Sequence, residues 1–89
     1  MGEKERFDEI FERVKQVVAE VFNSDENDLT LETRFIDDLG AESLDIITLL
    51  MEFEDTFDKR IPEEDAEKLV TVGDAVNYIM TMTEEPSQA

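Results

Sequence analysis

The sequence of 89 residues contains no cysteine and no histidine. Thiol nucleophiles, soft metal ligands and the side chain that most often serves as a general base are therefore absent. A serine hydrolase is a poor match, because its serine needs a histidine base and the Gly-x-Ser-x-Gly pattern is also missing. These absences predict a protein that is not an enzyme and that holds no metal in a catalytic site.

Long apolar runs are absent as well. No run approaches the roughly 20 residues that cross a bilayer. The first residues include no apolar stretch of the kind found in secretory signal peptides. The lack of cysteine suits a reducing compartment. We therefore expect a cytoplasmic protein that does not insert into membranes.

Basic residues are scarce: 8 stand against 25 acidic ones, which gives a net charge of −17. The imbalance is greatest at residues 37–58, where no lysine or arginine occurs among many carboxylates. Such a field repels nucleic acid and anionic membranes, and it speeds encounter with proteins that carry basic patches. Acidity alone can simply keep a small protein soluble. Its concentration in one segment favours the hypothesis that it attracts protein partners.

The 40% of residues that are apolar follow helical spacing in three segments. The first predicted helix ends near Phe22, and the second covers residues 43–57. Pro62 suits the first turn of a short helix, and Thr71 with Asp74 resembles a capping box at the start of the last one. The interpretation is an all-α fold, a small bundle of three main helices plus one short helix.

We expect one domain over residues 1–82 and a flexible C-terminal tail at residues 83–89. The segment between the first two helices has no sustained periodicity. Its apolar residues are predicted to anchor a long loop to the core: Leu29, Leu31, Phe35 and Ile36.

The second predicted helix has two apolar stripes. One is wide enough for the core and consists of Ile46, Leu49, Leu50, Phe53 and Phe57. The other consists of Leu44, Ile47 and Met51 and lies beside Ser43. The second stripe is either buried under the loop or exposed, as an apolar patch with acidic neighbours that suits a partner's basic groove.

Ser43 is the chief candidate for chemistry, because it follows a glycine turn and heads an apolar helix. A helix N-terminus favours a phosphate group through its free N–H groups and its dipole. The ordinary alternative is a serine that caps the helix. Simple phosphorylation is disfavoured, since nothing basic lies nearby in sequence to bind the new charge.

The segment Asp38-Leu39-Gly40-Ala41-Glu42-Ser43-Leu44-Asp45 closely resembles the Asp-Leu-Gly-Ala-Asp-Ser-Leu-Asp signature of acyl carrier proteins of dissociated fatty acid synthesis. The resemblance extends well beyond this signature. It covers essentially residues 7–80 and includes the segments 35–38, 54–57, 61–68 and 71–79.

The resemblance implies that Ser43 receives 4′-phosphopantetheine from coenzyme A through a carrier-protein synthase (a phosphopantetheinyl transferase). The thiol of this arm then holds acyl groups as thioesters, and the helices shelter the growing chain. It also implies a monomer that visits ketoacyl synthases, reductases, dehydratases and acyltransferases through their basic docking patches.

The resemblance further assigns partner recognition to the helix that follows the serine. The corresponding positions are Glu42, Leu44, Asp45, Ile47, Met51, Glu54 and Asp55. Three departures from the family pattern suit a carrier with particular partners. They are Glu42 in place of the usual aspartate, Thr48 where many relatives have glutamate, and the basic pair Lys59 and Arg60.

An alternative is an acidic helical interaction module, or a weak divalent-cation-binding one, that is never phosphopantetheinylated. A true calcium loop is disfavoured, because residues 25–28 begin like one but lack the required glycine. Clustered carboxylates would still bind divalent ions weakly.

Overall fold

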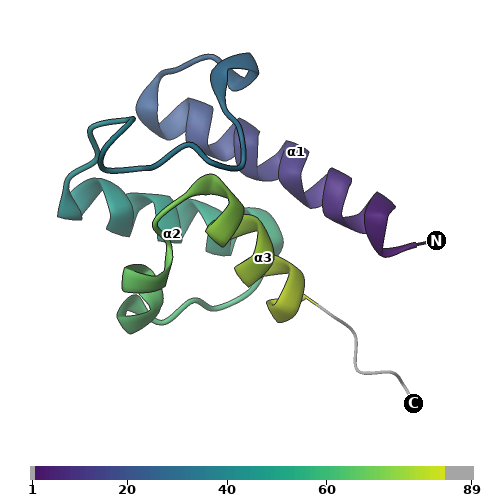
Figure 1. Cartoon of the computed structure of the whole chain (residues 1–89). Coiled ribbons are helices and arrows are strands. Elements are labelled where there is room, and N and C mark those ends of the chain that lie inside the picture. The colour runs from purple at the N-terminus through teal and green to yellow at the C-terminus, as the bar shows by residue number, and fades with distance from the viewer. Residues whose placement is uncertain (1, 84–89) are drawn as a thin grey trace.

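The computed structural model describes residues 2–83 and consists of three α-helices and two short 3₁₀ helices (Figure 1). No strand is present in this part of the chain, and Arg34 and Thr71 form a single isolated bridge. The prediction of an all-α bundle is confirmed. Residues 84–89 of the predicted tail lie outside the described residues. The elements are α1 (Glu3–Phe22), η1 (Glu26–Asp28), α2 (Ser43–Phe57), η2 (Glu63–Lys68) and α3 (Val72–Met82).

The two longer helices end where the sequence offers a residue that tolerates a left-handed backbone. Asn23 ends α1 with φ 54°, and Asp58 ends α2 with φ 56°. Asparagine and aspartate adopt this conformation more readily than other non-glycine residues. The predicted helix ends at Phe22 and Phe57 are therefore confirmed.

The core lies where α1 packs against both α2 and α3 (Figure 1). Every helical segment predicted to be amphipathic supplies it with side chains spaced three and four residues apart. Its buried members are Ile10, Val14, Val17 and Val18 from α1; Ile46, Leu49, Leu50 and Phe53 from α2; Val72, Ala75, Val76 and Ile79 from α3; and Leu29, Phe35, Ala41, Ile61 and Leu69 from the connecting segments.

The long loop before α2 is anchored by fewer side chains than predicted. Leu29 and Phe35 are buried, but Ile36 is 62% exposed and Leu31 is 37% exposed, so the prediction for these two was wrong. Hydrogen bonds from the N–H groups of Asp38 and Leu39 to the Arg34 carbonyl bend residues 34–39 into a helical turn. Neighbouring residues on such a turn point about 100° apart, so Phe35 and Ile36 cannot both face the core.

Backbone hydrogen bonds tie the same loop to the start of α3. The N–H of Gly73 donates to the Leu31 carbonyl at 2.8 Å, and that of Val72 donates to Thr33 at 2.9 Å. A Cβ at position 73 would lie 2.9 Å from the Leu31 oxygen, so the close approach requires glycine. Leu31 thus faces α3 with its backbone, which explains why its side chain is outside.

The last two helices begin close to where the sequence places them. The short helix is a 3₁₀ helix, and Pro62 is its N-cap instead of its first residue. The capping box of α3 is confirmed, because Thr71 and Asp74 exchange hydrogen bonds of 3.1 Å between side chain and backbone N–H. None of the helices within residues 2–83 is long and apolar enough to cross a membrane.

Candidate attachment site at the start of α2

The chain reaches Ser43 through a tight turn. Gly40 adopts a φ of +72°, which L-residues with a side chain rarely adopt. Ala41 is buried, and its N–H donates to the Phe35 carbonyl at 2.9 Å. The turn therefore fixes the start of α2 relative to the core and leaves Glu42 and Ser43 on the outside.

Ser43 is the first residue of α2 and does not cap it. The N-cap is Glu42, and the Asp45 carboxylate accepts a hydrogen bond from the Glu42 N–H at 3.0 Å. The Ser43 side chain is exposed, and its hydroxyl has no hydrogen-bond partner among residues 2–83. The alternative hypothesis, that Ser43 serves as the N-cap of the helix, is therefore wrong, and the serine oxygen is available for modification.

This division of roles predicts that two alanine substitutions differ in their effect on stability. Asp45→Ala should lower the free energy of unfolding by about 1 kcal/mol, because the N-terminal hydrogen bond is lost. Ser43→Ala should change it by less than about 0.5 kcal/mol, as for an exposed residue without a partner. Urea unfolding followed by circular dichroism measures both values. An equal loss for the two variants would contradict the assignment of the cap.

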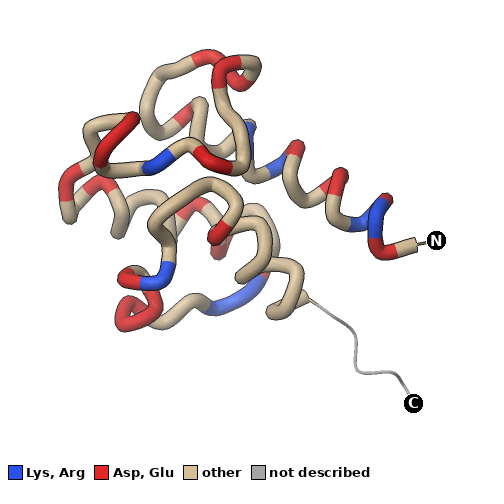
Figure 2. Tube along the Cα trace, viewed as in Figure 1, with Lys and Arg blue, Asp and Glu red and all other residues tan. Residues whose placement is uncertain are grey.

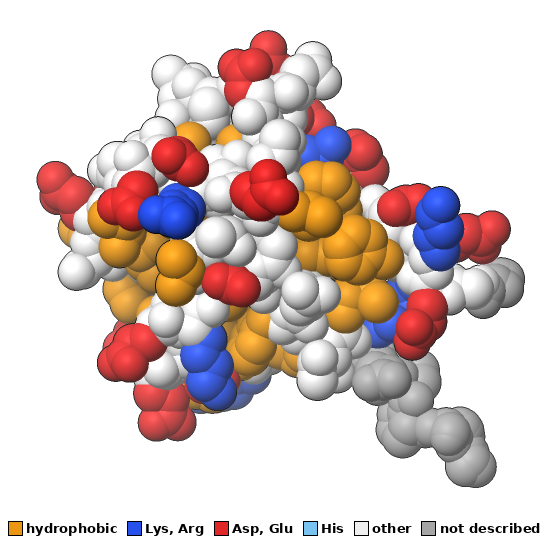
Figure 3. Space-filling view, in the orientation of Figure 1, with side chains coloured by type: hydrophobic (Ala, Val, Ile, Leu, Met, Phe, Trp, Pro, Cys, Tyr) orange, Lys and Arg blue, Asp and Glu red, His pale blue; other side chains and the backbone are white. Residues whose placement is uncertain are grey.

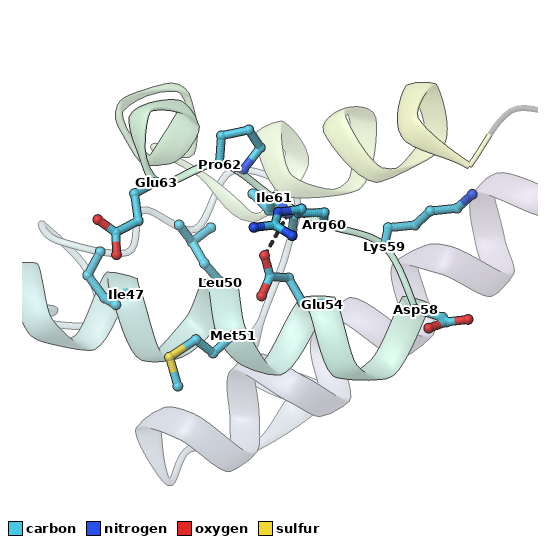
Figure 4. Close-up of a pocket in the computed structure, with 10 residues that line it drawn as sticks. All are labelled: Ile47, Leu50, Met51, Glu54, Asp58, Lys59, Arg60, Ile61, Pro62 and Glu63. Carbon is cyan, nitrogen blue, oxygen red and sulfur yellow. Dashed lines mark hydrogen bonds between the residues drawn. The ribbon is translucent and has the colours of Figure 1, made fainter.

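Two hollows lie on either side of the face of α2 that begins at Ser43. Residues three and four positions along a helix share its face, which brings Ile46 and Ile47 next to the serine. The Ile46 hollow, of about 230 Å³, is lined by Arg34, Ile36, Asp37, Ile46, Ala66, Glu67, Leu69 and Val70. The Ile47 hollow, of about 600 Å³, is lined by Ile47, Leu50, Met51, Glu54, Asp58, Lys59, Arg60, Ile61, Pro62 and Glu63 (Figure 4).

The second apolar stripe of α2 lies partly on the surface and partly in a hollow. Leu44 is 72% exposed and Met51 is 57% exposed, whereas Ile47 is half-buried and forms a wall of the Ile47 hollow. Burial of the whole stripe under the loop is thereby excluded. On the face shown in Figure 3, hydrophobic side chains reach the surface in patches bordered by acidic ones.

The acidic residues predicted to meet partners differ in what they already do within the fold. Asp45 holds the N-terminus of α2. Glu54 accepts a hydrogen bond from the Ile61 N–H at 2.7 Å, which draws the loop after α2 against the helix (Figure 4). Asp55 is exposed and forms no ion pair within residues 2–83. Of these three, only Asp55 is free for a partner.

Acidic residues dominate the surroundings of the serine. In the loops before α2 they outnumber one basic residue, Arg34, and they also mark the first turn of α2, whereas the loop between α2 and η2 carries a basic stretch (Figure 2). That stretch is Lys59 and Arg60, and neither residue forms an ion pair in the described part of the chain. Arg34 is neutralised by Asp37 at 3.1 Å. The serine thus faces a strongly negative surface.

A polar contact between η2 and α3 was not predicted. The Tyr78 hydroxyl donates a hydrogen bond to Asp65, and Lys68 Nζ lies 3.3 Å from the other oxygen of the same carboxylate. Burial and then the Asp65 carboxylate raise the pKa of Tyr78 to about 12. The hydrogen bond from Tyr78, helped by Lys68, lowers the pKa of Asp65. The sequence spacing indicates the Asp65–Lys68 pair, but nothing in it points to Tyr78.

No group of three or more carboxylates within residues 2–83 is placed to hold a metal ion together. The weak divalent-cation alternative therefore gains no support from the geometry.

An exposed serine on a capped helix N-terminus, between two partly apolar hollows, fits a long phosphate-linked group. These features define a small helical carrier domain. The sequence model of a family described as "Phosphopantetheine attachment site" matches residues 12–79. An acyl carrier protein from Clostridium acetobutylicum is 50% identical over 76 residues, which cover 85% of this chain and 99% of that relative.

The chain belongs to the acyl carrier protein family. Its prosthetic group is 4′-phosphopantetheine, attached covalently, and it holds acyl groups for the enzymes that act on them. This role explains a protein without cysteine, because the working thiol belongs to the prosthetic group. The role is that of a carrier rather than a catalyst.

Proposed function

We propose that Ser43 is the residue to which 4′-phosphopantetheine is attached. The observation that supports it most is the division of labour at the start of α2. Glu42 and Asp45 cap the helix, and the Ser43 hydroxyl is left exposed without a hydrogen-bond partner among residues 2–83. The first-turn N–H groups and the helix dipole stabilise the negative charge of a phosphodiester at this position.

The other serines of the chain are weaker candidates. The sequence contains three, at positions 24, 43 and 87. The Ser24 oxygen is buried, so a modifying enzyme could reach it only after local unfolding. Ser87 lies outside the described residues. Of the serines within residues 2–83, only Ser43 combines an exposed hydroxyl with the N-terminus of a long helix.

The bound phosphopantetheine arm supplies a thiol that forms thioesters, and the protein supplies an apolar hollow for the acyl group. The Ile46 hollow begins one turn from Ser43 and is lined by Ile36, Ile46 and Leu69 among others. Apolar burial there would keep an acyl chain from water and favour its retention between transfers. The acyl groups would be those of fatty acid synthesis or of a related lipid or polyketide pathway.

The partners would include a phosphopantetheinyl transferase, ketoacyl synthases, reductases, dehydratases and acyltransferases. Leu44, Met51 and Asp55 form the part of the predicted recognition surface that is exposed and not used inside the fold. Lys59 and Arg60 add a basic edge to it, which suits enzymes that place an acidic group there. We propose a monomeric, cytoplasmic carrier with one domain at residues 1–82 and no direct contact with nucleic acid or membrane.

Mass measurement of the intact protein tests this function. The protein is incubated with coenzyme A, magnesium and a broad-specificity phosphopantetheinyl transferase, and it should gain one phosphopantetheine. Ser43→Ala should gain none while unfolding at the same urea concentration as the unsubstituted protein, since Ser43 is not the cap. Loading of Ser43→Ala, or no gain in the unsubstituted protein with several transferases, would contradict the proposal.

A further inference from the structure

The 3₁₀ helix η2 is a short segment held between two buried anchors. None of its residues, Glu63–Lys68, is buried. Before it, Ile61 is 4% exposed and its N–H is bound by Glu54. After it, Leu69 is also 4% exposed. Segments with little buried apolar surface open locally at a lower free energy than the rest of a fold.

Between these anchors, η2 is joined to another helix by one side-chain hydrogen bond within residues 2–83. It is the bond from the Tyr78 hydroxyl of α3 to Asp65, whose side chain is 20% exposed. A hydrogen bond to a charged, partly buried acceptor is stronger than one between neutral groups. The raised pKa of Tyr78 and the lowered pKa of Asp65 agree with a neutral phenol that donates to a carboxylate.

The position of η2 makes this bond relevant to the carrier site, because η2 separates the two hollows beside α2. Ala66 and Glu67 line the Ile46 hollow, and Glu63 lines the Ile47 hollow above Ile47 (Figure 4). Movement of η2 away from α2 would join the hollows and uncover the buried Leu50.

The size of the Ile46 hollow relates this movement of η2 to the length of the acyl chain. At about 230 Å³, the Ile46 hollow is smaller than ligand sites of roughly 300–1,000 Å³. It suits a short acyl chain, whereas a longer chain needs the space that η2 now divides.

We propose that Tyr78 is a positioning residue for the acyl chain. By holding Asp65 it keeps η2 closed against α2 and so limits the length of chain that the carrier shelters. The part that concerns the acyl chain rests on the proposed function of Ser43. The closure of η2 itself does not.

Hydrogen exchange of the unmodified protein tests the closure. In Tyr78→Phe, the amides of residues 63–69 should exchange about tenfold faster, as expected for the loss of a hydrogen bond to a charged group. The amides of α1 should be unaffected, and Asn77→Ala, an exposed change on the same helix, should alter neither set. An unchanged rate at residues 63–69, or an equal increase in every helix, overturns the proposal.

Tyrosine absorbance gives a second readout, because Tyr78 is the only tyrosine and the chain contains no tryptophan. The phenolate should appear with a midpoint near pH 12, and Asp65→Asn should move it toward the ordinary value of 10.0. Since the pKa is raised in the folded state, the stabilisation is complete below pH 10 and is lost as the pH rises through about 12. A midpoint near 10 while circular dichroism still shows the folded protein overturns the hydrogen bond.

Loading with saturated acyl chains of increasing length tests the consequence. The melting temperature of each loaded protein is compared between long and short acyl chains. The extra stabilisation that long chains give over short ones should be larger in Tyr78→Phe than in the unsubstituted protein. The same gain at every length in both proteins overturns the role in chain length. Failure to load either protein would instead contradict the proposed function, and the exchange experiment would still decide the closure.

Discussion

Phe35→Ala is expected to lower the free energy of unfolding by about 3–5 kcal/mol, the usual cost of removing a buried phenylalanine from a core. Phe35 is 0% exposed and stacks on Phe22 with ring centroids 6.5 Å apart. Its backbone also binds Val70 and Ala41, so the lost ring leaves a cavity where the long loop meets the helices. The total free energy of unfolding of a small domain is only about 5–15 kcal/mol, so much of its stability would be lost.

The neighbouring residue provides a matched control. Ile36 is 62% exposed on the same turn, and Ile36→Ala should change the free energy of unfolding by less than about 0.5 kcal/mol. Both variants are measured by urea unfolding with circular dichroism. Because the loop positions Ser43, phosphopantetheine loading should fall in Phe35→Ala and persist in Ile36→Ala. Similar costs at the two positions would show that the loop is not anchored through Phe35.

Leu44→Ala is expected to reduce kcat/KM for phosphopantetheine loading about tenfold, with no loss of stability. Leu44 directly follows Ser43 and is 72% exposed, so its side chain adds little to the fold. Only the few side chains at the centre of a docking surface contribute more than about 1 kcal/mol to binding, and we expect Leu44 to be one of them; a loss of about 1.4 kcal/mol corresponds to a tenfold change.

Val70→Ala is the control, because Val70 is 54% exposed and lies outside α2. Steady-state loading rates and melting temperatures of both variants separate recognition from stability. Equal rates for Leu44→Ala and the unsubstituted protein would remove Leu44 from the recognition surface. A lower melting temperature for Leu44→Ala would show that it is a packing residue.

The helices and the position of Ser43 could be predicted from the sequence because local patterns determine them. The apolar spacing of residues 43–57 specifies one long helix, and Gly40 specifies the turn before it. The same periodicity indicated that α2 has more apolar residues than one core-facing stripe holds, but it left open whether Leu44 and Met51 are buried or, as the structure shows them to be, exposed.

Other features depend on contacts between distant segments, which local patterns do not encode. Glu54 was predicted to face partners, yet its hydrogen bond to Ile61 gives it a role inside the fold. Glu54→Lys would therefore disturb the loop after α2 as well as docking, and Asp55→Lys is the cleaner test of charge. The bond from Tyr78 to Asp65 joins two helices and has no sequence signature.

The cap of α2 shows the same limit at short range. A serine at a helix start is typically the N-cap, but here Glu42 takes that position and Asp45 accepts its N–H. A shift of the N-cap by one residue decides whether the Ser43 hydroxyl accepts a hydrogen bond from the helix backbone or is free for modification. Sequence patterns place helix ends only to within a few residues, so this distinction required the structure.

Fragmentation mass spectrometry of the loaded protein tests the central claim, attachment at Ser43, most directly. The protein is loaded from coenzyme A, digested, and its peptides are fragmented to locate the added mass. The phosphopantetheine should appear on the peptide that contains Ser43, with the mass change between Glu42 and Leu44. Its presence on Ser24, on Ser87 or on a threonine would contradict the attachment site.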